Sequence, residues 1–203
     1  MELKAIQIPS KMTHEWVKKK HYAHRIPPIS YAFGLYDGTE IVGICTYGIP
    51  MGASLKRGIC GVEYENIVLE LNRLCLNDGL PKNTASNFIS QTFKLLPKPS
   101  ILVSYADTGQ NHTGYIYQAT NWIYTGLGAG GSSWAVKGLE NLHHITIEDS
   151  VGRYEDRDDE FTLEELLKKK YGEKLYRKSE SKKHRYIYFL GNKREREQTY
   201  LAN

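Results

Sequence analysis

The sequence predicts a mixed α/β (α+β) protein in which helices flank a central sheet, and three stretches support this prediction. Residues 31–36 and 41–48 are rich in aromatic and β-branched side chains on either side of an Asp-Gly-Thr turn, which is typical of a β-hairpin. Residues 69–76 form another strand-like run that ends at a turn-forming Asn-Asp-Gly cluster. Apolar residues then recur at helical spacing over residues 85–96, and residues 101–103 resemble a buried strand.

Composition predicts one soluble domain over residues 1–203, with a basic C-terminal strand and tail at about 182–203. Hydrophobic residues make up 40% and charged residues 25%, and no apolar run reaches membrane-spanning length, so no membrane partner is expected. The N-terminal segment MELKAIQIP lacks the apolar region of a signal peptide, which predicts a cytoplasmic protein. The net charge of +4 permits a nucleic-acid partner without requiring one. Three cysteines without CxxC spacing indicate buried free thiols.

The N-terminal part is expected to contain a strand over residues 3–8 and a following helix. Ser10 or Thr13 is a suitable cap, and the helix should run to residue 25, since Pro27 and Pro28 stop it. Its three lysines, 18–20, are either a solvated helix end or an arm that contacts phosphates.

Between the hairpin and residue 65 the sequence predicts a loop. It contains several glycines and the pair Lys56-Arg57, and it is either a simple connection or a mobile basic lip.

The C-terminal half predicts further strands at 134–136 and 143–147, and the glycines of 126–131 favour a turn over a phosphate cradle. Residues 153–160 form a charged connector, and Thr162 with Glu165 forms a capping box that begins a helix.

A last strand is expected at 186–190, between the basic clusters 182–185 and 193–196. Such clusters around an aromatic strand suit phosphate contacts and base stacking, although the second cluster is equally well a solvated tail.

Two features mark a binding site near the middle of the chain. The loop before residue 85 leads into a helix capped by Asn83 or Thr84, and the N–H groups and dipole of a helix start suit a pyrophosphate, although an ordinary β–α turn looks the same. Ser104, Tyr105 and Asp107 are polar groups at the carboxyl end of a strand, where α/β sheets usually bind ligands.

Several phrases of the sequence resemble the Mom family of phage DNA-modifying proteins, which are of GNAT acetyltransferase type. These phrases are LELNRL, PKNTASNFI, SYAD, GYIYQATNWIYTG and KHRYIYFLGNKRER, so the resemblance covers most of the chain. Tyr117, Asn121 and Trp122 match the spacing of the GNAT tyrosine and glycine-aromatic signature. The resemblance implies a mostly antiparallel sheet in which residues 69–76 and 101–105 form a splayed parallel pair that holds the pantetheine of acetyl-CoA.

Four residues are candidates for catalysis. The resemblance implies that Tyr117 protonates the departing thiolate; the alternative is a core tyrosine on a short helix. Asp107 is a candidate to orient or deprotonate an amine, and also a candidate N-cap. Arg73 is expected to pair with Asp107 or to steady an oxyanion or phosphate, and Ser104 is a further catalytic candidate.

Residues for the coenzyme, and His21 and Tyr22 for the substrate, follow from the same resemblance, and the basic DNA contacts follow from the charge clusters. The GNAT loop usually reads Q/R-x-x-G-x-G/A, and of the aligned residues Leu80, Asn83 and Ala85 only Ala85 fits, so backbone N–H groups and the charge of Lys82 are expected to hold the pyrophosphate. The expected coenzyme contacts are Leu74, Leu76, Lys82, Asn83, Thr84, Ala85, Ser86 and Asn111. The expected DNA contacts are Lys20, His21, Tyr22, Arg25, Lys183 and Arg185.

The resemblance implies conversion of adenine N6 in double-stranded DNA into a carbamoylmethyl (acetamido-type) derivative that hides restriction sites in a phage-infected host. The base must be flipped out of the helix for this chemistry. Plain acetyl transfer would leave an N-acetyl group, so a complete mechanism needs another nitrogen source, and a metal ion such as iron stays open although no metal cluster is visible in the sequence.

Two other functions remain open at the level of sequence. One is a GNAT transferase that acts on another amine, such as a hypermodified pyrimidine, tRNA or protein. The other is a non-catalytic GNAT-like DNA-binding protein, which the poor match at Leu80 and Asn83 motivates.

Overall fold

The computed structural model describes residues 2–152 and 161–201 and divides the chain into two compact units. The first unit comprises Met1–Gly128 and Lys183–Asn203, and the second comprises Ala129–Lys182. Each unit has a hydrophobic core of its own. Whether the two units fold together as the single expected domain stays a prediction.

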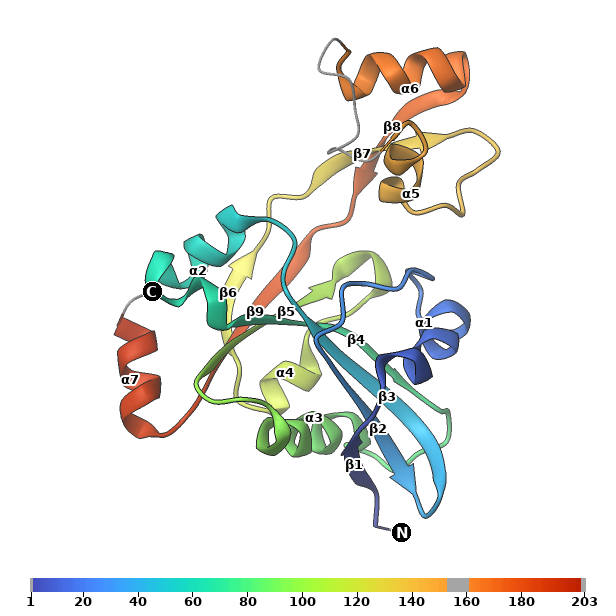
Figure 1. Ribbon diagram of the computed structural model, residues 1–203. Coiled ribbons are helices and arrows are strands. Elements are labelled where there is room, and N and C mark those ends of the chain that lie inside the picture. Colours follow the sequence, from blue (N-terminus) through green and yellow to red (C-terminus); the bar gives the residue numbers. More distant parts are fainter. Residues whose placement is uncertain (1, 153–160, 202–203) are drawn as a thin grey trace. The chain divides into compact units, whose positions relative to one another are not determined.

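The first unit is built on a seven-stranded sheet with the strand order β1-β2-β3-β4-β5-β9-β6 (Figure 1). All neighbouring strands are antiparallel except β4 and β5, which are parallel, and this confirms the predicted fold class. The strands are β1 (Lys4–Gln7), β2 (Tyr31–Asp37), β3 (Glu40–Gly48), β4 (Val68–Leu76), β5 (Ser100–Asp107), β6 (Ile123–Leu127) and β9 (Lys183–Leu190).

The parallel pair is splayed, as expected. Its register runs from Val68 opposite Ile101 to Glu70 opposite Val103 and goes no further. Both strands continue beyond that point, β4 to Leu76 and β5 to Asp107, so unpaired strand edges face each other across an opening.

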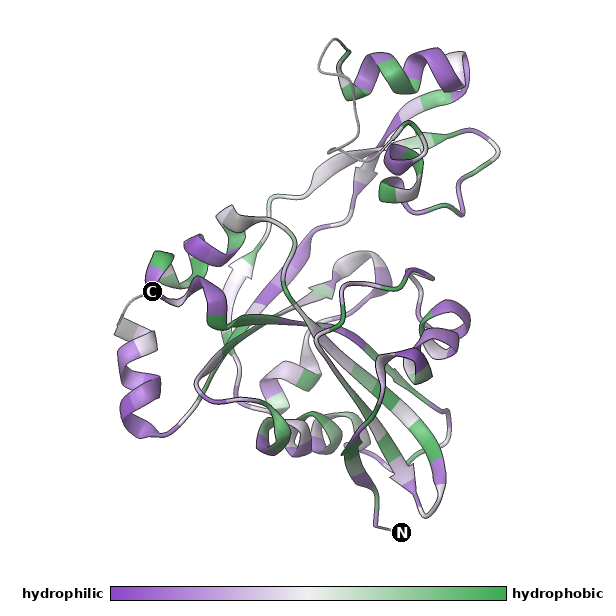
Figure 2. Cartoon of the chain, in the orientation of Figure 1, coloured by the Kyte–Doolittle hydropathy of each residue, from purple (hydrophilic) through white to green (hydrophobic). Residues whose placement is uncertain are grey.

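Helices cover both faces of this sheet. Alternate residues of β5 show the division: Leu102 packs with Phe88 of α3, whereas Val103 packs with Ile59 of α2. Figure 2 shows hydrophobic residues concentrated along the central strands and α3, and mostly hydrophilic residues on α7. The helices are α1 (His14–Lys20), α2 (Ala53–Tyr64), α3 (Thr84–Leu95), α4 (Tyr115–Ala119) and α7 (Lys193–Leu201).

Three local predictions were wrong. Helix α1 ends at Lys20 instead of residue 25, because His21 is extended (φ −83°, ψ 133°) and its Nδ1 accepts the Ala23 N–H at 3.1 Å. The loop predicted over residues 50–65 contains helix α2, which the buried Ile59 and Cys60 anchor and which is kinked at Gly61 (φ +73°, ψ 176°). The strand predicted at 143–147 is instead the start of helix α5 (His144–Asp149), which the His143 side chain caps by accepting the Ile145 N–H.

The second unit pairs β7 (Gly131–Val136) with β8 (Leu175–Glu180) in antiparallel fashion and adds α5 and α6 (Leu163–Tyr171). The capping box of Thr162 and Glu165 is confirmed at the start of α6. The charged connector of residues 153–160 lies outside the described residues.

The chain leaves and re-enters the first unit at adjacent positions, because the Gly128 N–H donates to the Lys183 carbonyl at 2.9 Å. The three cysteines are buried and free, as predicted. Over the described residues, none of the helices combines the length and apolar character that crossing a membrane requires.

Candidate active site

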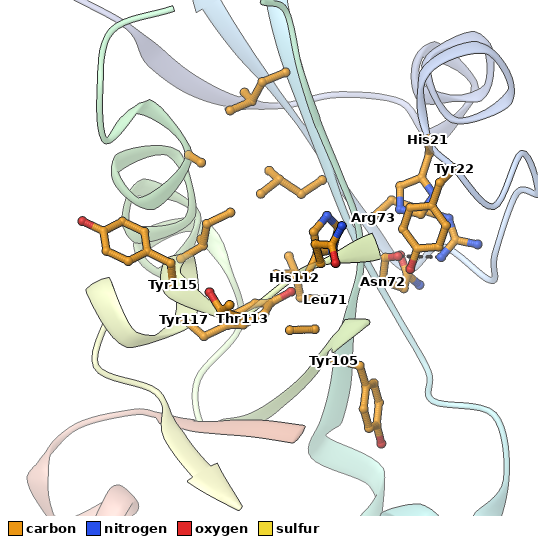
Figure 3. A pocket seen from close by; sticks show the side chains of 17 residues that line it. His21, Tyr22, Leu71, Asn72, Arg73, Tyr105, His112, Thr113, Tyr115 and Tyr117 are labelled. Atoms are coloured by element: carbon orange, nitrogen blue, oxygen red, sulfur yellow. Dashed lines mark hydrogen bonds between the residues drawn. The ribbon is translucent and has the colours of Figure 1, made fainter. Parts of the chain in front are cut away.

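A cavity of about 420 Å³ lies where β4 and β5 part, and we call it the central cavity. Five segments line it: the end of β4, the start of α3, the end of β5, the loop and helix 111–117, and the segment that follows α1 (Figure 3). Eight of the predicted residues are among its lining: His21, Tyr22, Arg73, Leu74, Leu76, Ala85, Asn111 and Tyr117. The topology thus brings together residues that lie far apart in the sequence.

Tyr117 presents its phenol to this cavity from α4. Its Oη lies 2.8 Å from Ser104 Oγ, and Ser104 Oγ lies 2.8 Å from the Leu71 carbonyl oxygen. Burial raises the pKa of Tyr117 to about 12, although the Ser104 hydrogen bond acts in the opposite direction. The phenol is therefore protonated at neutral pH and able to donate a hydrogen bond.

A glycine fixes the helix that carries Tyr117. Gly114 precedes α4 with φ +77°, and a Cβ at this position would lie 2.3 Å from the ring and hydroxyl of Tyr186. The Tyr186 hydroxyl donates to the Thr113 carbonyl at 2.9 Å, so the ring cannot easily move away. Only glycine combines this backbone conformation with this close approach.

Asp107 organises the loop beside the cavity. Its buried carboxylate accepts the Gly109 N–H at 2.8 Å, which is the N-cap contact that the sequence offered as an alternative to catalysis. Its carbonyl accepts the His112 N–H at 3.1 Å, and its Oδ2 lies 4.0 Å from Lys183 Nζ. A role of Asp107 in proton transfer stays a prediction.

Arg73 holds the segment after α1 against the sheet. Its guanidinium donates to the Arg25 carbonyl at 2.9 and 3.3 Å and to the Asn72 carbonyl at 2.6 Å. These contacts replace the pairing with Asp107 that the sequence suggested. They also place His21 and Tyr22 at the cavity wall (Figure 3).

Three aromatic rings meet at that wall. His21 stacks on Tyr22 with centroids 4.4 Å apart, and Tyr22 meets His112 edge-on at 6.0 Å. Burial, together with Arg73, lowers the pKa of His21 to about 3, so this imidazole is neutral at pH 7. Tyr22 is 45% exposed, which leaves part of its surface available to a ligand.

Sequence reasoning missed His112 and Glu70. His112 lines the cavity from the loop after β5, and the only signal for it was its place in the segment following a strand that ends in polar residues. Glu70 is the last β4 residue paired with β5, and burial raises the pKa of its carboxyl while Arg73 and Lys183 oppose the shift. Its position at the opening of the strands was not visible before the register was known.

A second cavity of about 650 Å³ lies at the start of α3, and we call it the α3 cavity. It contains the predicted coenzyme residues Lys82, Asn83, Thr84, Ala85 and Ser86 and shares Leu76, Ala85, Tyr115 and Ile116 with the central cavity. Asn83 is the N-cap by position, but its side chain makes no capping hydrogen bond. The first turn of α3 therefore keeps its affinity for an anion from outside the helix.

The predicted DNA residues lie mostly outside the lining of the central cavity. Lys20 contacts the Trp16 ring at 4.4 Å and the Asn77 side chain. Arg185 Nε donates to Thr125 Oγ1 at 2.8 Å, and Lys183 reaches the cavity region through Asp107. Among residues 2–152 and 161–201, no three His, Cys, Asp or Glu side chains converge as a metal site requires.

Two solved structures share the fold of this chain. One is a candidate phosphinothricin N-acetyltransferase with a TM-score of 0.52 and 8% identity, over 94% of this chain and 100% of that chain. The other is a candidate acetyltransferase from Acinetobacter baylyi ADP1 with a TM-score of 0.50 and 9% identity, over 93% and 92% of the two chains. At such identities the likeness concerns the fold alone, and it confirms the expected GNAT fold.

Sequence relatives are more specific. A protein of Escherichia phage Mu described as "Methylcarbamoylase mom" is 28% identical over 151 residues, which is 72% of this chain. The match spans 62% of the phage Mu protein, less than two thirds of its length. The family model of the Mom protein family matches residues 2–203, almost the whole chain. The protein therefore belongs to the Mom protein family.

Proposed function

We propose that this protein is a DNA-modifying transferase that uses an acyl-CoA and acts on the N6 amine of adenine. The product would be the carbamoylmethyl derivative, which protects phage DNA from restriction enzymes in the host cytoplasm. Acetyl transfer to N6 with release of the coenzyme thiol gives only an N-acetyl group, so this product also requires an ammonia-level nitrogen donor and a two-electron oxidant that acts on the acetyl methyl carbon, both as co-substrates. Family membership supports the class of reaction, and the phage Mu relative carries the description of a methylcarbamoylase.

The observation that carries the proposal is the opening between β4 and β5 with a protonated phenol at its base. The unpaired edges beyond Glu70 and Val103 offer backbone groups to an extended pantetheine chain. The central and α3 cavities adjoin through Ala85, so one ligand can run from Tyr117 to the start of α3. The N-terminus of α3, together with Lys82, suits the pyrophosphate of coenzyme A.

The protein's own groups have separate tasks in this proposal. A bound acyl-CoA supplies an activated acyl carbon at the base of the opening. Tyr117 holds its proton, because burial raises its pKa to about 12, and stabilises developing negative charge by hydrogen bonding. Glu70 ends the β4–β5 pairing and Asp107 ends β5, and the raised pKa of Glu70 favours it as a proton acceptor.

The acceptor base would enter beside Tyr22 and His112. The exposed part of the Tyr22 ring is a stacking surface for a flipped adenine, and stacking of this kind is worth about 1–3 kcal/mol per base. Arg25, Lys183 and Arg185 belong to the same unit and are proposed to contact the DNA backbone.

The test is a digest of DNA from cells that express the protein, with the nucleosides separated and weighed by mass spectrometry. Wild type is expected to produce a modified deoxyadenosine, and Tyr117→Phe much less of it. The carbamoylmethyl product contains one more nitrogen than an N-acetyl product, so mass distinguishes the two. A modified pyrimidine, or modified tRNA or protein with unmodified DNA, would support a transferase for another amine instead.

A protein that binds DNA but neither binds coenzyme A nor modifies any nucleoside would refute the proposal and support a non-catalytic role. Coenzyme A binding is measured by calorimetry on the purified full chain. Tyr124→Phe is a matched control, because it removes the same hydroxyl from an exposed tyrosine outside the central cavity.

A further inference from the structure

Ser104 occupies the point where the parallel strands part. In the β4–β5 register Glu70 faces Val103, so Leu71 and Ser104 would form the next pair. The backbone pairing ends before this pair, and the Ser104 side chain contacts Leu71 instead, with Oγ 2.8 Å from the Leu71 carbonyl oxygen. Ser104 as a whole is 1% exposed, so this contact lies inside the protein.

The same hydroxyl contacts the phenol of Tyr117 at 2.8 Å. Over the described residues, Ser104 is the hydrogen-bonding partner of Tyr117 Oη, and the ring of Tyr117 otherwise packs on Trp122 and Tyr186 with centroids 5.3 and 5.0 Å away. These neighbours present rings to Tyr117, so the direction of its O–H bond depends on Ser104.

A serine hydroxyl has one proton and two acceptor lone pairs, whereas a carbonyl oxygen only accepts. If Ser104 donates to Leu71, its Oγ accepts from Tyr117, and the phenol proton points away from the cavity. If Ser104 donates to Tyr117, the phenol proton is free to point into the cavity. The two arrangements differ by rotation of two hydroxyl groups, that of Ser104 and that of Tyr117.

We propose that Ser104 is a positioning residue that ends the β4–β5 ladder and directs the Tyr117 proton toward a ligand in the central cavity. This inference rests on the proposed function for the role of Tyr117. When an acceptor atom of a ligand accepts a hydrogen bond from the phenol, the O–H bond of Tyr117 turns away from Ser104. Ser104 then donates its own hydrogen bond to Tyr117 Oη. The chain of donors becomes Ser104, Tyr117, ligand.

The electrostatics of Tyr117 agree with this assignment. Burial raises the pKa of the phenol, and the Ser104 hydrogen bond is the contact that lowers it. A hydroxyl donor that stabilises the phenolate also strengthens the phenol as a donor, because neighbouring hydrogen bonds polarise one another.

The test replaces Tyr117 by a fluorinated tyrosine, whose phenol titrates nearer neutrality, and follows its ionisation by ultraviolet absorbance. Removing the hydroxyl with Ser104→Ala should raise the pKa at position 117 by about one unit, the size of one hydrogen bond to a charged group. Ser104→Cys fills the same space with a weaker donor and should give a smaller shift in the same direction.

Ser100→Ala is the matched control. Ser100 is a buried serine on the same strand, and its hydroxyl contacts a backbone carbonyl, that of Pro97, at 2.7 Å. It lies away from Tyr117, so its removal should leave the titration at position 117 within a few tenths of a unit. An unchanged titration in both Ser104 variants, or an equal shift in Ser100→Ala, would overturn the assignment.

Kinetics provide a second measurement. Ser104→Ala in the otherwise natural protein should lower kcat about tenfold with KM for the acyl-CoA unchanged, which a merely structural defect would not produce. If wild type modifies no DNA, the proposed function fails and the titration still decides the role of Ser104. If DNA is modified but the pKa at position 117 is unchanged in the Ser104 variants, the inference about Ser104 fails and the proposed function stands.

Discussion

Removal of the Tyr117 hydroxyl is the most direct test of the candidate site. Tyr117→Phe keeps the ring between Trp122 and Tyr186 and deletes only Oη. Ser104 retains its second acceptor, the Leu71 carbonyl, so no buried donor loses its partner. The free energy of unfolding should therefore fall by about 1 kcal/mol or less.

The effect on catalysis follows from the acidity of the phenol. Burial holds the pKa of Tyr117 at about 12, whereas an alkyl thiol titrates near ~8.5. Complete proton transfer to a thiolate would thus be uphill by roughly 5 kcal/mol, so we expect Tyr117 to act as a hydrogen-bond donor. A hydrogen bond to a charged group is worth about 1.5–3 kcal/mol, which corresponds to a loss of roughly 10- to 150-fold in kcat.

The assay measures release of the coenzyme thiol by purified protein with DNA and acyl-CoA. KM for the acyl-CoA should stay within about twofold, because the hydroxyl contributes mainly where charge develops. Tyr124→Phe should behave like wild type. A kcat equal to that of wild type would remove Tyr117 from the mechanism, and a loss near ~10⁴ would show complete proton transfer and refute the argument from acidity.

Four other predictions follow from particular contacts. Asp107→Ala should cost about 1 kcal/mol of stability by removing the cap, while Asp107→Asn, which keeps an acceptor for the Gly109 N–H, should cost little; full activity of the Asn variant would exclude the carboxylate as a base. The folded pKa of His21, about 3, lies below its ordinary value of 6.5, so the unfolded chain binds the extra proton and stability falls as pH drops from 6.5 toward 3. Denaturant titrations should show that the free energy of unfolding falls by up to about 2 kcal/mol between pH 7 and 5 because of His21. This fall should be absent in His21→Gln and retained in His14→Gln, and an equal pH dependence in wild type and both variants would contradict the prediction. Gly114→Ala should destabilise the fold by about 2–5 kcal/mol through left-handed strain and overpacking, and an unchanged melting temperature by circular dichroism would disprove the close approach. Replacing residues 129–182 by a short glycine linker should leave a cooperative melting transition and coenzyme A binding, because Gly128 and Lys183, the residues that the linker would join, are already hydrogen-bonded to each other. An unfolded product would show that the units depend on each other.

Local patterns predicted much of the sheet. The hairpin of β2 and β3, the strands β4 and β5, and helix α3 all have a periodicity or a turn that operates within a few residues. The capping box of α6 is likewise a short-range hydrogen-bond pattern. Such signals do not depend on the rest of the fold, which is why they could be read from the sequence.

Other elements depend on remote partners. Strand β6 is short and largely exposed, and it exists as a strand because it pairs with β9 about sixty residues later, at Ile123 opposite Ile187. Helix α2 contains glycines that argue against a helix; burial of Ile59 and Cys60 against the sheet overrides that preference up to Gly61, where the helix is kinked. Neither partner can be identified from the local sequence.

The sequence by itself determined the helices and strands of the mixed sheet through local order and spacing, and its resemblance to the family implied the parallel strands and the candidacy of Tyr117. The tertiary structure alone decided which side chains lie together: it added His112 to the cavity lining, placed Glu70 at the end of the β4–β5 pairing, gave Arg73 backbone partners, and placed Ser104 between Leu71 and Tyr117. The physical reason is that hydrogen bonds and burial act through space, so the register of β4 on β5, and not spacing along the chain, sets each partner.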